Sequence, residues 1–219
     1  MPSTSRTPRP LLIAVDGPAA SGKGTIARAL AAHFRLPHMD TGMLYRAVAV
    51  SLNRFGGDPG NEFEAVRAVT GLAQVAADDP ELRSEFAGSV ASRISAYPGV
   101  RAALIDRQRD FANQDSGAVL DGRDVGTVIA PHATAKLFVT ASVEVRATRR
   151  LAELEMRGAG AHYDDVLIDI RARDERDAGR AAAPLMRAID AELLDTSEMG
   201  IEAAIARAIA LVEAKLAAA

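Results

Sequence analysis

Nine residues near the N-terminus have the order expected of a loop that binds phosphate. The segment from Gly17 to Thr25 reads GPAASGKGT and stands between a short apolar run and a helical pattern. Glycines let the backbone turn tightly, so that successive N–H groups point inward at phosphate oxygens. The N-terminus of the following helix adds partial positive charge, and Lys23 can reach the terminal phosphates of a nucleotide. The predicted phosphate-binding residues are Gly17, Pro18, Ala19, Ala20, Ser21, Gly22, Lys23, Gly24 and Thr25.

The loop departs from the usual phosphate-loop pattern at one position. That pattern puts Ser or Thr directly after the lysine, where its hydroxyl contacts a magnesium ion. Here Gly24 follows Lys23, and Thr25 comes next. The GKGT form is similar to that of nucleoside monophosphate kinases. It leaves open whether a hydroxyl near Thr25 contacts Mg²⁺ directly or only through water, and we expect the nucleotide and water to hold most of the metal.

Two further segments place arginine where a parallel sheet binds its ligands. Residues 40–46 read DTGMLYR, and residues 121–126 read DGRDVG directly after an apolar run. Ligands of open α/β sheets bind at the carboxyl ends of the strands, and arginine holds phosphate in a bidentate manner. Two simpler interpretations remain open. Asp40 and Thr41 can cap the helix that follows them, and Arg123 can belong to an ordinary turn with a salt bridge.

A charged segment towards the C-terminus puts several ions on one predicted helical face. Arg173, Arg176, Asp177 and Arg180 stand at positions i, i+3, i+4 and i+7, which lie on one side of a helix. Such a face is typical of a solvated helix with Arg173–Asp177 and Asp169–Arg173 pairs, each contributing about 0.2–0.5 kcal/mol. Beside a phosphate loop it indicates mobile cations instead, because phosphoryl transfer develops negative charge.

Composition excludes several classes of protein. The chain has 219 residues, a formal net charge of −3 and no cysteine, which excludes disulfide scaffolds, thiolate zinc sites and cysteine nucleophiles. Of the 26 basic residues, only Lys23, Lys136 and Lys215 are lysines, which leaves 23 arginines. We assign most of these arginines, including Arg149 and Arg150, to coding bias and surface solvation. No long basic run occurs, which argues against a general binder of nucleic acid or membrane surfaces.

The N-terminal residues superficially suggest a signal peptide. Arginines precede the apolar run Leu11–Val15, but Asp16 ends that run after five residues, fewer than the roughly 7–15 of a signal core. No uncharged stretch approaches the roughly 20 residues of a membrane helix. We therefore expect residues 1–10 to form a disordered tail and the protein to be cytoplasmic.

Apolar runs alternate with longer helical patterns along the chain. The predicted strands are Leu11–Asp16, Gly117–Asp121, Ala135–Thr140 and Glu192–Asp195, with an apparent further strand after His38. The predicted helices are Thr25–Phe34, Val100–Phe111, Ser142–Arg157 and Ile201–Ala218. This alternation predicts a three-layer α/β/α fold around a five-stranded parallel sheet. The polar segment Asn53–Pro98 and the charged segment Gly158–Arg180 do not fit the alternation, and we interpret them as inserted lobes.

Five segments taken together resemble the bacterial cytidylate kinases. They are DGPAASGKGT, DTGMLYR, SRISAYPGVR, DGRDVGTVI and RDERDAGRAAAPL, in this order. The resemblance implies a phosphate-loop kinase core formed by residues 11–40, 98–157 and 181–219, with a monophosphate-binding lobe at 41–97 and a lid at 158–180. It implies transfer of the γ-phosphoryl group of Mg-ATP to CMP and dCMP. The lobe is short compared with that of some relatives, which leaves the choice of base open.

The resemblance also implies roles for individual residues. The loop from Gly17 to Thr25 would bind the phosphates of ATP. The residues implied in binding CMP are Asp40, Thr41, Arg46, Ser92, Arg101, Asp121, Arg123, Asp124, Arg173, Asp177 and Arg180. Of these, Arg46 and Arg123 would hold its phosphate, whereas the cytosine would be read by Ser92, Arg101 and Asp124. The residues implied in catalysis are Lys23, Arg123, Arg173 and Arg180; no histidine is needed, and His38 is expected to be structural.

Two alternatives to a cytidylate kinase differ in their class of function. A related small-molecule kinase would act on AMP, UMP or shikimate, and the trio Ser92, Arg101 and Asp124 distinguishes it. A GTP-dependent switch would carry the strings D-x-x-G and N-K-x-D, and neither occurs. We expect ATP and CMP or dCMP as partners, with Mg²⁺ and without nucleic acid or membrane. The C-terminal helix presents no large apolar stripe, so we expect a monomer.

Overall fold

A computed structural model describes residues 10–218; residues 1–9 of the expected tail lie outside them. At its centre is a five-stranded parallel sheet with the order β2-β3-β1-β4-β5. Its strands are β1 (Leu12–Asp16), β2 (His38–Asp40), β3 (Ala118–Gly122), β4 (Ala135–Thr140) and β5 (Glu192–Asp195). The helices are α1 (Lys23–Phe34), α2 (Thr41–Arg54), α3 (Glu62–Ala68), α4 (Glu85–Ile94), α5 (Pro98–Ala112), α6 (Val143–Met156), α7 (Tyr163–Ala178) and α8 (Ile201–Ala217).

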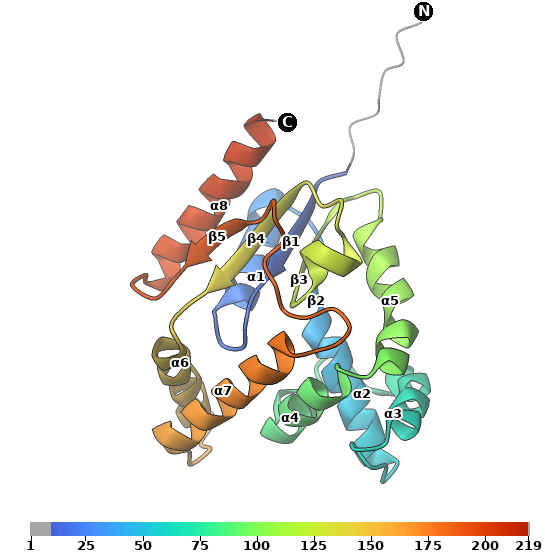
Figure 1. Ribbon diagram of the computed structural model, residues 1–219. Helices are drawn as coiled ribbons and strands as arrows, with labels where there is room; N and C mark the ends of the chain where they lie inside the picture. Colours follow the sequence, from blue (N-terminus) through green and yellow to red (C-terminus); the bar gives the residue numbers. More distant parts are fainter. Residues whose placement is uncertain (1–9, 219) are drawn as a thin grey trace, which may run out of the picture.

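The sheet is covered on both faces, which explains why its central strands are continuously apolar. All five residues of β1 and of β3 are buried, as expected for a parallel sheet between two helical layers. Ile13 and Val15 of β1 pack with α1 and α8, while Leu12 and Ala14 face α5 and a π-helical turn over residues 125–129. Figure 1 shows these layers. The predicted three-layer α/β/α class is confirmed.

The carboxyl ends of the strands bring polar residues from distant segments together. In the parallel register, Asp40 of β2 lies opposite Asp121 of β3, and Asp16 of β1 lies opposite Gly122. Because all strands run in one direction, these residues meet at a single edge of the sheet. In Figure 1, α2, α4 and α7 lie below that edge.

Two helical groups beside this edge have cores of their own. Helices α2 to α5 share a cluster that includes Val48, Leu52 and Ile94. Helices α6 and α7 pack through a second cluster that includes Leu154 and Ile170. Residues 53–98 contain helices and no strand, as the polar segment Asn53–Pro98 predicted. None of the helices within residues 10–218 is long and apolar enough to cross a membrane.

The start of α2 is capped as the sequence predicted, whereas the start of α1 and the end of α7 differ from the prediction. Asp40 caps α2 by accepting a hydrogen bond from the backbone of Met43 at 3.3 Å, as predicted. Helix α1 begins at Lys23, two residues before the predicted start, because Gly22 takes a left-handed turn with φ of 87°. Helix α7 ends at Ala178. The prediction that Arg180 continues the helical face is therefore wrong, since the chain leaves the helix before that residue.

Candidate active site

The predicted phosphate loop joins β1 to α1 and is shaped by close backbone contacts. A Cβ atom on Gly17 would collide with the carbonyl oxygen of Val139 on the neighbouring strand. Gly22 supplies the left-handed turn that starts α1, a conformation that glycine adopts without steric cost. The Lys23 ammonium donates to the carbonyl oxygen of Pro18 at 3.3 Å, so the side chain folds back over the loop.

Lys23 is a cation that its surroundings do not fully compensate. Burial and then the nearby charge of Arg123 lower its pKa from 10.5 to about 8, against opposing contributions from Asp121, Asp40 and Asp177. An anion bound beside the ammonium would favour its charged form and raise this pKa again. The loop therefore has the electrostatics of a site for phosphate.

Two carboxylates face this loop from the ends of β2 and β3. Asp40 and Asp121 line one cavity with Lys23 and Gly24. Burial, followed by the charge of Asp121, raises the pKa of Asp40. His38, which lies in β2 rather than before it, forms a hydrogen bond through Nε2 to Oδ1 of Asp121 at 2.8 Å. This contact orients the Asp121 side chain, which agrees with the structural role expected for His38.

Two adjoining cavities contain most of the predicted site. The inner cavity, of about 100 Å³, lies between α2, α4, α5 and α7. Its lining includes nine predicted residues: Thr41, Arg46, Ser92, Arg101, Arg123, Asp124, Arg173, Asp177 and Arg180. The phosphate-loop cavity, of about 210 Å³, is lined by Lys23, Asp40 and Asp121. Arg46, Arg123 and Arg173 line both cavities, so three guanidinium groups stand where the two meet.

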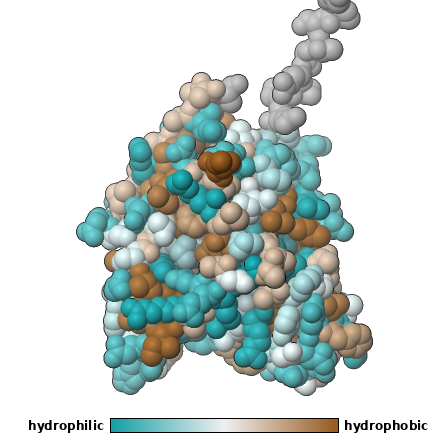
Figure 2. Space-filling view, viewed as in Figure 1, coloured by the Kyte–Doolittle hydropathy of each residue, from teal (hydrophilic) through white to brown (hydrophobic). Residues whose placement is uncertain are grey.

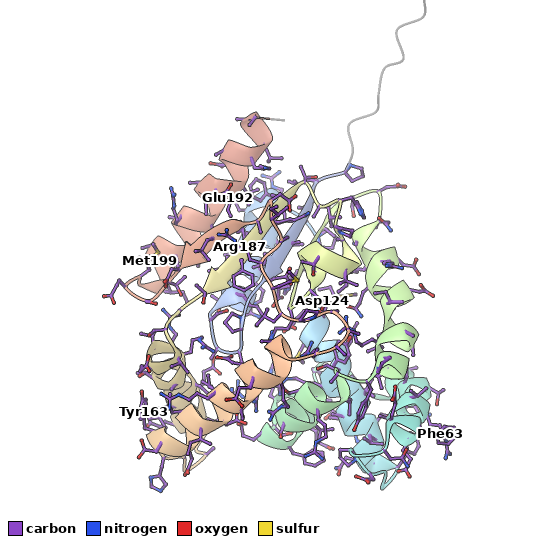
Figure 3. All side chains as sticks on the ribbon, viewed as in Figure 1. Phe63, Asp124, Tyr163, Arg187, Glu192 and Met199 are labelled. Carbon is purple, nitrogen blue, oxygen red and sulfur yellow. The ribbon has the colours of Figure 1, made fainter. Side chains whose placement is uncertain are left out.

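The deep end of the inner cavity holds a buried ion pair. Arg101 of α5 pairs with Asp124, which follows β3, and the two side chains are only 9% and 7% exposed. Arg101 also donates to the hydroxyl of Tyr45 and to the carbonyl oxygen of Ser95, both at 3.4 Å. Figure 3 labels Asp124 near the centre of the molecule, between the sheet and the helices below it. The pair presents a fixed donor and a fixed acceptor to this cavity.

Arg123 connects the end of β3 to the end of α7. Its Nε donates to Oδ2 of Asp177 at 2.7 Å, and Asp177 also pairs with Arg180. Burial acts to raise the pKa of Asp177, but the charges of Arg123 and Arg180 outweigh it and lower that pKa. Asp177 pairs with these two arginines instead of Arg173, so the predicted Arg173–Asp177 pair is wrong. The predicted Asp169–Arg173 pair forms, with 2.8 Å between Arg173 Nε and Asp169 Oδ2.

Arg46 stands at the junction without a carboxylate partner among residues 10–218. Its Nη1 donates to the carbonyl oxygens of Leu82 and Ser84, at 2.9 and 3.2 Å. Burial, and then the charges of Arg173 and Arg150, lower its pKa to about 10. Arg46 is a buried cation beside other cations, and Lys23 is a buried cation with a lowered pKa; an incoming anion would stabilise the charged form of both.

The assignment of Arg149 and Arg150 to surface solvation is wrong. Arg149 donates to Oγ1 and the carbonyl oxygen of Thr196, at 2.9 and 2.7 Å, and to the carbonyl oxygen of Ser21 at 3.4 Å. Arg150 lines the phosphate-loop cavity and pairs with Glu85 of α4. Their spacing from Arg146, at i+3 and i+4 on one face of the helix, is the signal that could have identified them.

A third cavity, of about 420 Å³, lies on the other side of the phosphate loop. Ser21, Gly22 and Thr25 line it together with Arg149 and residues at the start of α8. Thr25 therefore faces this side cavity, whereas Gly24 faces Asp40 and Asp121. Of the nine predicted loop residues, Gly17 and Pro18 line none of these three cavities.

Asp16, at the end of β1, is a buried residue that the sequence did not single out. Its carboxylate accepts from the backbone N–H groups of Val125 and Gly126, at 2.8 and 2.7 Å. Burial raises its pKa to about 6. These two hydrogen bonds hold the π-helical turn that follows Asp124, so Asp16 positions the deep end of the inner cavity.

The fold and the site together define a phosphate-loop kinase. Comparison with known proteins gives the family: the sequence profile described as cytidylate kinase matches residues 13–214. A cytidylate kinase of Xanthobacter autotrophicus is 59% identical over 207 residues, covering 94% of this chain and 98% of that protein. A cytidylate kinase of Methylocella silvestris is 55% identical over 203 residues, with 93% and 94% covered. This chain belongs to the cytidylate kinase family.

A solved structure supports the fold alone. An uncharacterized protein from Eubacterium ventriosum superposes with a TM-score of 0.57 and 13% sequence identity. The match covers 93% of this chain and 98% of that protein.

Proposed function

We propose that the protein transfers the γ-phosphoryl group of ATP to CMP and dCMP, giving CDP or dCDP and ADP. The observation that supports this most directly is the junction of the two cavities at Arg46, Arg123 and Arg173. A nucleoside monophosphate with its base in the inner cavity would bring its phosphate to these three arginines. Lys23 and the phosphate loop stand on the other side of them, where a donor phosphate would lie.

Transfer in this arrangement needs no nucleophilic side chain. An oxygen of the CMP phosphate attacks the γ-phosphorus, and the bond from that phosphorus to the β-bridging oxygen of ATP breaks. Lys23, Arg123, Arg173 and Arg180 would supply positive charge around the group in transit. Positioning and charge of this kind supply most of the catalysis in phosphoryl transfer.

The deep end of the inner cavity suits a cytosine base. Asp124 can accept from the exocyclic amino group of cytosine, whereas the uracil oxygen at that position offers no hydrogen. Arg101 can donate to the ring acceptors, and its pairing with Asp124 fixes the direction of both groups. A site built to hydrogen-bond one edge rejects a ligand that leaves its buried polar groups unpaired.

The residues at the carboxyl edge of the sheet fit a magnesium ion brought by ATP. Asp40 and Asp121 are neighbouring carboxylates, and the raised pKa of Asp40 reflects their mutual repulsion as well as burial. No group of three candidate metal ligands occurs within residues 10–218, so the nucleotide and water would hold most of the ion, with these two carboxylates facing it. When bound, Mg²⁺ neutralises phosphate charge. Thr25 faces the side cavity, which argues against it as a ligand.

Parts of the two helical groups would act as lobes that close over the substrates. We assign monophosphate binding to residues 41–97 and the lid to residues 158–180, with the core formed by 11–40, 98–157 and 181–219. The pairing of Arg123 with Asp177 joins the core to the lid. Closure of such lobes excludes water, which would otherwise accept the phosphoryl group.

The side cavity is the place we assign to the nucleoside of ATP. It opens beside Gly22 and Thr25, and Arg149 ties its far wall to the loop through Thr196 and Ser21. ATP would then approach the loop from one side and CMP from the other. The expected monomeric state and cytoplasmic location stay predictions.

A coupled assay of ADP release tests the proposed function. The wild-type protein is given Mg-ATP with CMP, dCMP, UMP or AMP as the acceptor. We expect kcat/KM to be highest for CMP, with dCMP next and the other two well below. A protein that uses UMP or AMP as well as CMP would be a different nucleotide kinase, and one that releases no ADP with any of the four would not be one of this class.

A further inference from the structure

Helix α7 contacts α4 across the mouth of the inner cavity (Figure 1). Two side-chain contacts join them. Nη2 of Arg173 lies 4.0 Å from Oε2 of Glu85, and Nε of Arg176 donates to Oγ of Ser92 at 3.3 Å. Glu85 and Ser92 are two turns apart on α4, so they lie on the same face. The Arg176 contact is therefore part of an aligned interface between two helices.

The Arg176 contact affects which hydrogen-bonding groups of the Ser92 hydroxyl remain for a ligand. A serine hydroxyl has one hydrogen to donate and two lone pairs to accept with. The guanidinium can only donate, so it occupies a lone pair of Ser92 Oγ and leaves the hydrogen for another partner. Within residues 10–218, Arg176 is the sole hydrogen-bond partner of this oxygen. Ser92 lines the inner cavity, and its hydrogen is available to a ligand there.

A donor at this position distinguishes two pyrimidines. N3 of cytosine carries a lone pair and accepts a hydrogen bond, whereas N3 of uracil carries a hydrogen and cannot accept. A hydroxyl that is free to rotate would adapt to either base by donating or accepting. A guanidinium on one lone pair leaves the hydroxyl its hydrogen and a second lone pair. Its positive charge makes the oxygen a poorer acceptor and the hydrogen a better donor, which favours the base that accepts.

We propose that Arg176 is a positioning residue that favours Ser92 as a hydrogen-bond donor over Ser92 as an acceptor, and so increases the preference for cytosine over uracil. Arg176 belongs to α7 and Ser92 to α4, so the effect exists only while the two helices are in contact. Closure of the lid and selection of the base are thereby coupled. The inference rests on the proposed function, because it requires a pyrimidine base in the inner cavity.

The test is a double-mutant cycle on base preference. We expect Arg176→Met to lower the ratio of kcat/KM for CMP to that for UMP by about three- to tenfold, the scale of one hydrogen bond between neutral groups. In a Ser92→Ala background the same substitution should leave the ratio unchanged. Arg176→Lys should retain most of the preference, since an ammonium also donates. Arg171→Met is the matched control: Arg171 is 57% exposed on the same helix and pairs with Glu144 at 3.7 Å.

The outcomes separate this inference from the proposed function. If Ser92→Ala lowers the ratio and Arg176→Met does not, the role of Arg176 is wrong and base reading by Ser92 survives. If Arg176→Met lowers the ratio equally with and without Ser92, Arg176 acts by another route and the inference is also wrong. If Ser92→Ala leaves the ratio at the wild-type value, Ser92 does not read the base, and both the inference and that part of the proposed function are overturned.

Discussion

The inner cavity and the phosphate-loop cavity share three lining arginines, but they differ in whether their cations are paired with carboxylates. At the deep end of the inner cavity, Arg101 pairs with Asp124. At the loop end, Lys23 and Arg46 donate only to backbone carbonyl oxygens within residues 10–218. Their pKa values are lowered to about 8 and about 10.

This difference matches two kinds of ligand chemistry. A buried ion pair is balanced before the ligand arrives, so it can select a neutral base by the direction of its hydrogen bonds without requiring charge. Cations crowded together carry a desolvation cost that an anion relieves. The molecule therefore separates selection of the base from binding of the phosphates. Substitutions at the loop end should lower kcat, and substitutions at the deep end should lower the preference for CMP over UMP. On the face in Figure 2, hydrophobic side chains occur in scattered groups among polar ones.

The largest effect is expected at the loop end. Lys23→Met should lower kcat by roughly 10²–10³ or more, the scale of losing one donor to the transition state. Because Lys23 does not touch the base, the ratio of kcat/KM for CMP to that for UMP should stay at the wild-type value. Lys215→Met, an exposed lysine of α8, is the matched control. Wild-type turnover in Lys23→Met would contradict the assignment of this lysine.

A smaller effect is expected at the deep end, where the substitution should change the preference for CMP over UMP. Asp124→Ala removes the partner of a buried guanidinium, so the free energy of unfolding should fall by about 3–5 kcal/mol, measured by urea titration. The CMP-to-UMP ratio should fall about tenfold or more, because the acceptor for the amino group is lost. Asp190→Ala breaks an ion pair with Lys136 away from both cavities and should leave the ratio unchanged. An unchanged ratio in Asp124→Ala would show that Asp124 does not read the base.

The smallest expected effect is the uptake of protons by Lys23 when ATP binds. Lys23 has a pKa of about 8 in the free protein, below its ordinary value. Phosphate beside the ammonium favours the charged form, so binding of ATP should raise the pKa and take up protons. At pH 8 the uptake should be about 0.5 proton, since half of the lysine is neutral at its pKa. At pH 6 it should vanish.

Titration calorimetry in HEPES and in Tris, which differ in ionisation enthalpy, measures this uptake. Lys23→Met supplies the control and should show none at pH 8. Release of protons, or the same uptake without Lys23, would mean that the ammonium is not the group that responds to phosphate.

Local patterns were sufficient to predict the fold. Continuous apolar runs such as Ala135–Thr140 indicated strands buried on both faces, and glycines and caps such as Asp40 marked where helices begin. The residues predicted to bind CMP also lie around two joined cavities, because the parallel sheet gathers the ends of its strands at one edge.

Contacts between distant segments could not be predicted. Whether Asp177 pairs with its own helix or with Arg123, which follows β3, depends on how α7 lies on the core, and the sequence pattern favoured the local partner. Arg149 and Arg150 looked like surface residues because their partners, Thr196 and Glu85, are far away along the chain. The role of Asp16 depends on backbone N–H groups more than a hundred residues later.

A crystal structure with CMP and a non-hydrolysable ATP analogue tests the central claim most directly. The account predicts the CMP phosphate within hydrogen-bonding distance of Arg46 and Arg123, and the cytosine between Ser92, Arg101 and Asp124. It predicts the donor phosphates on the loop around Lys23. A complex with the cytosine in the side cavity beside Thr25, or with its phosphate away from the junction arginines, would contradict it.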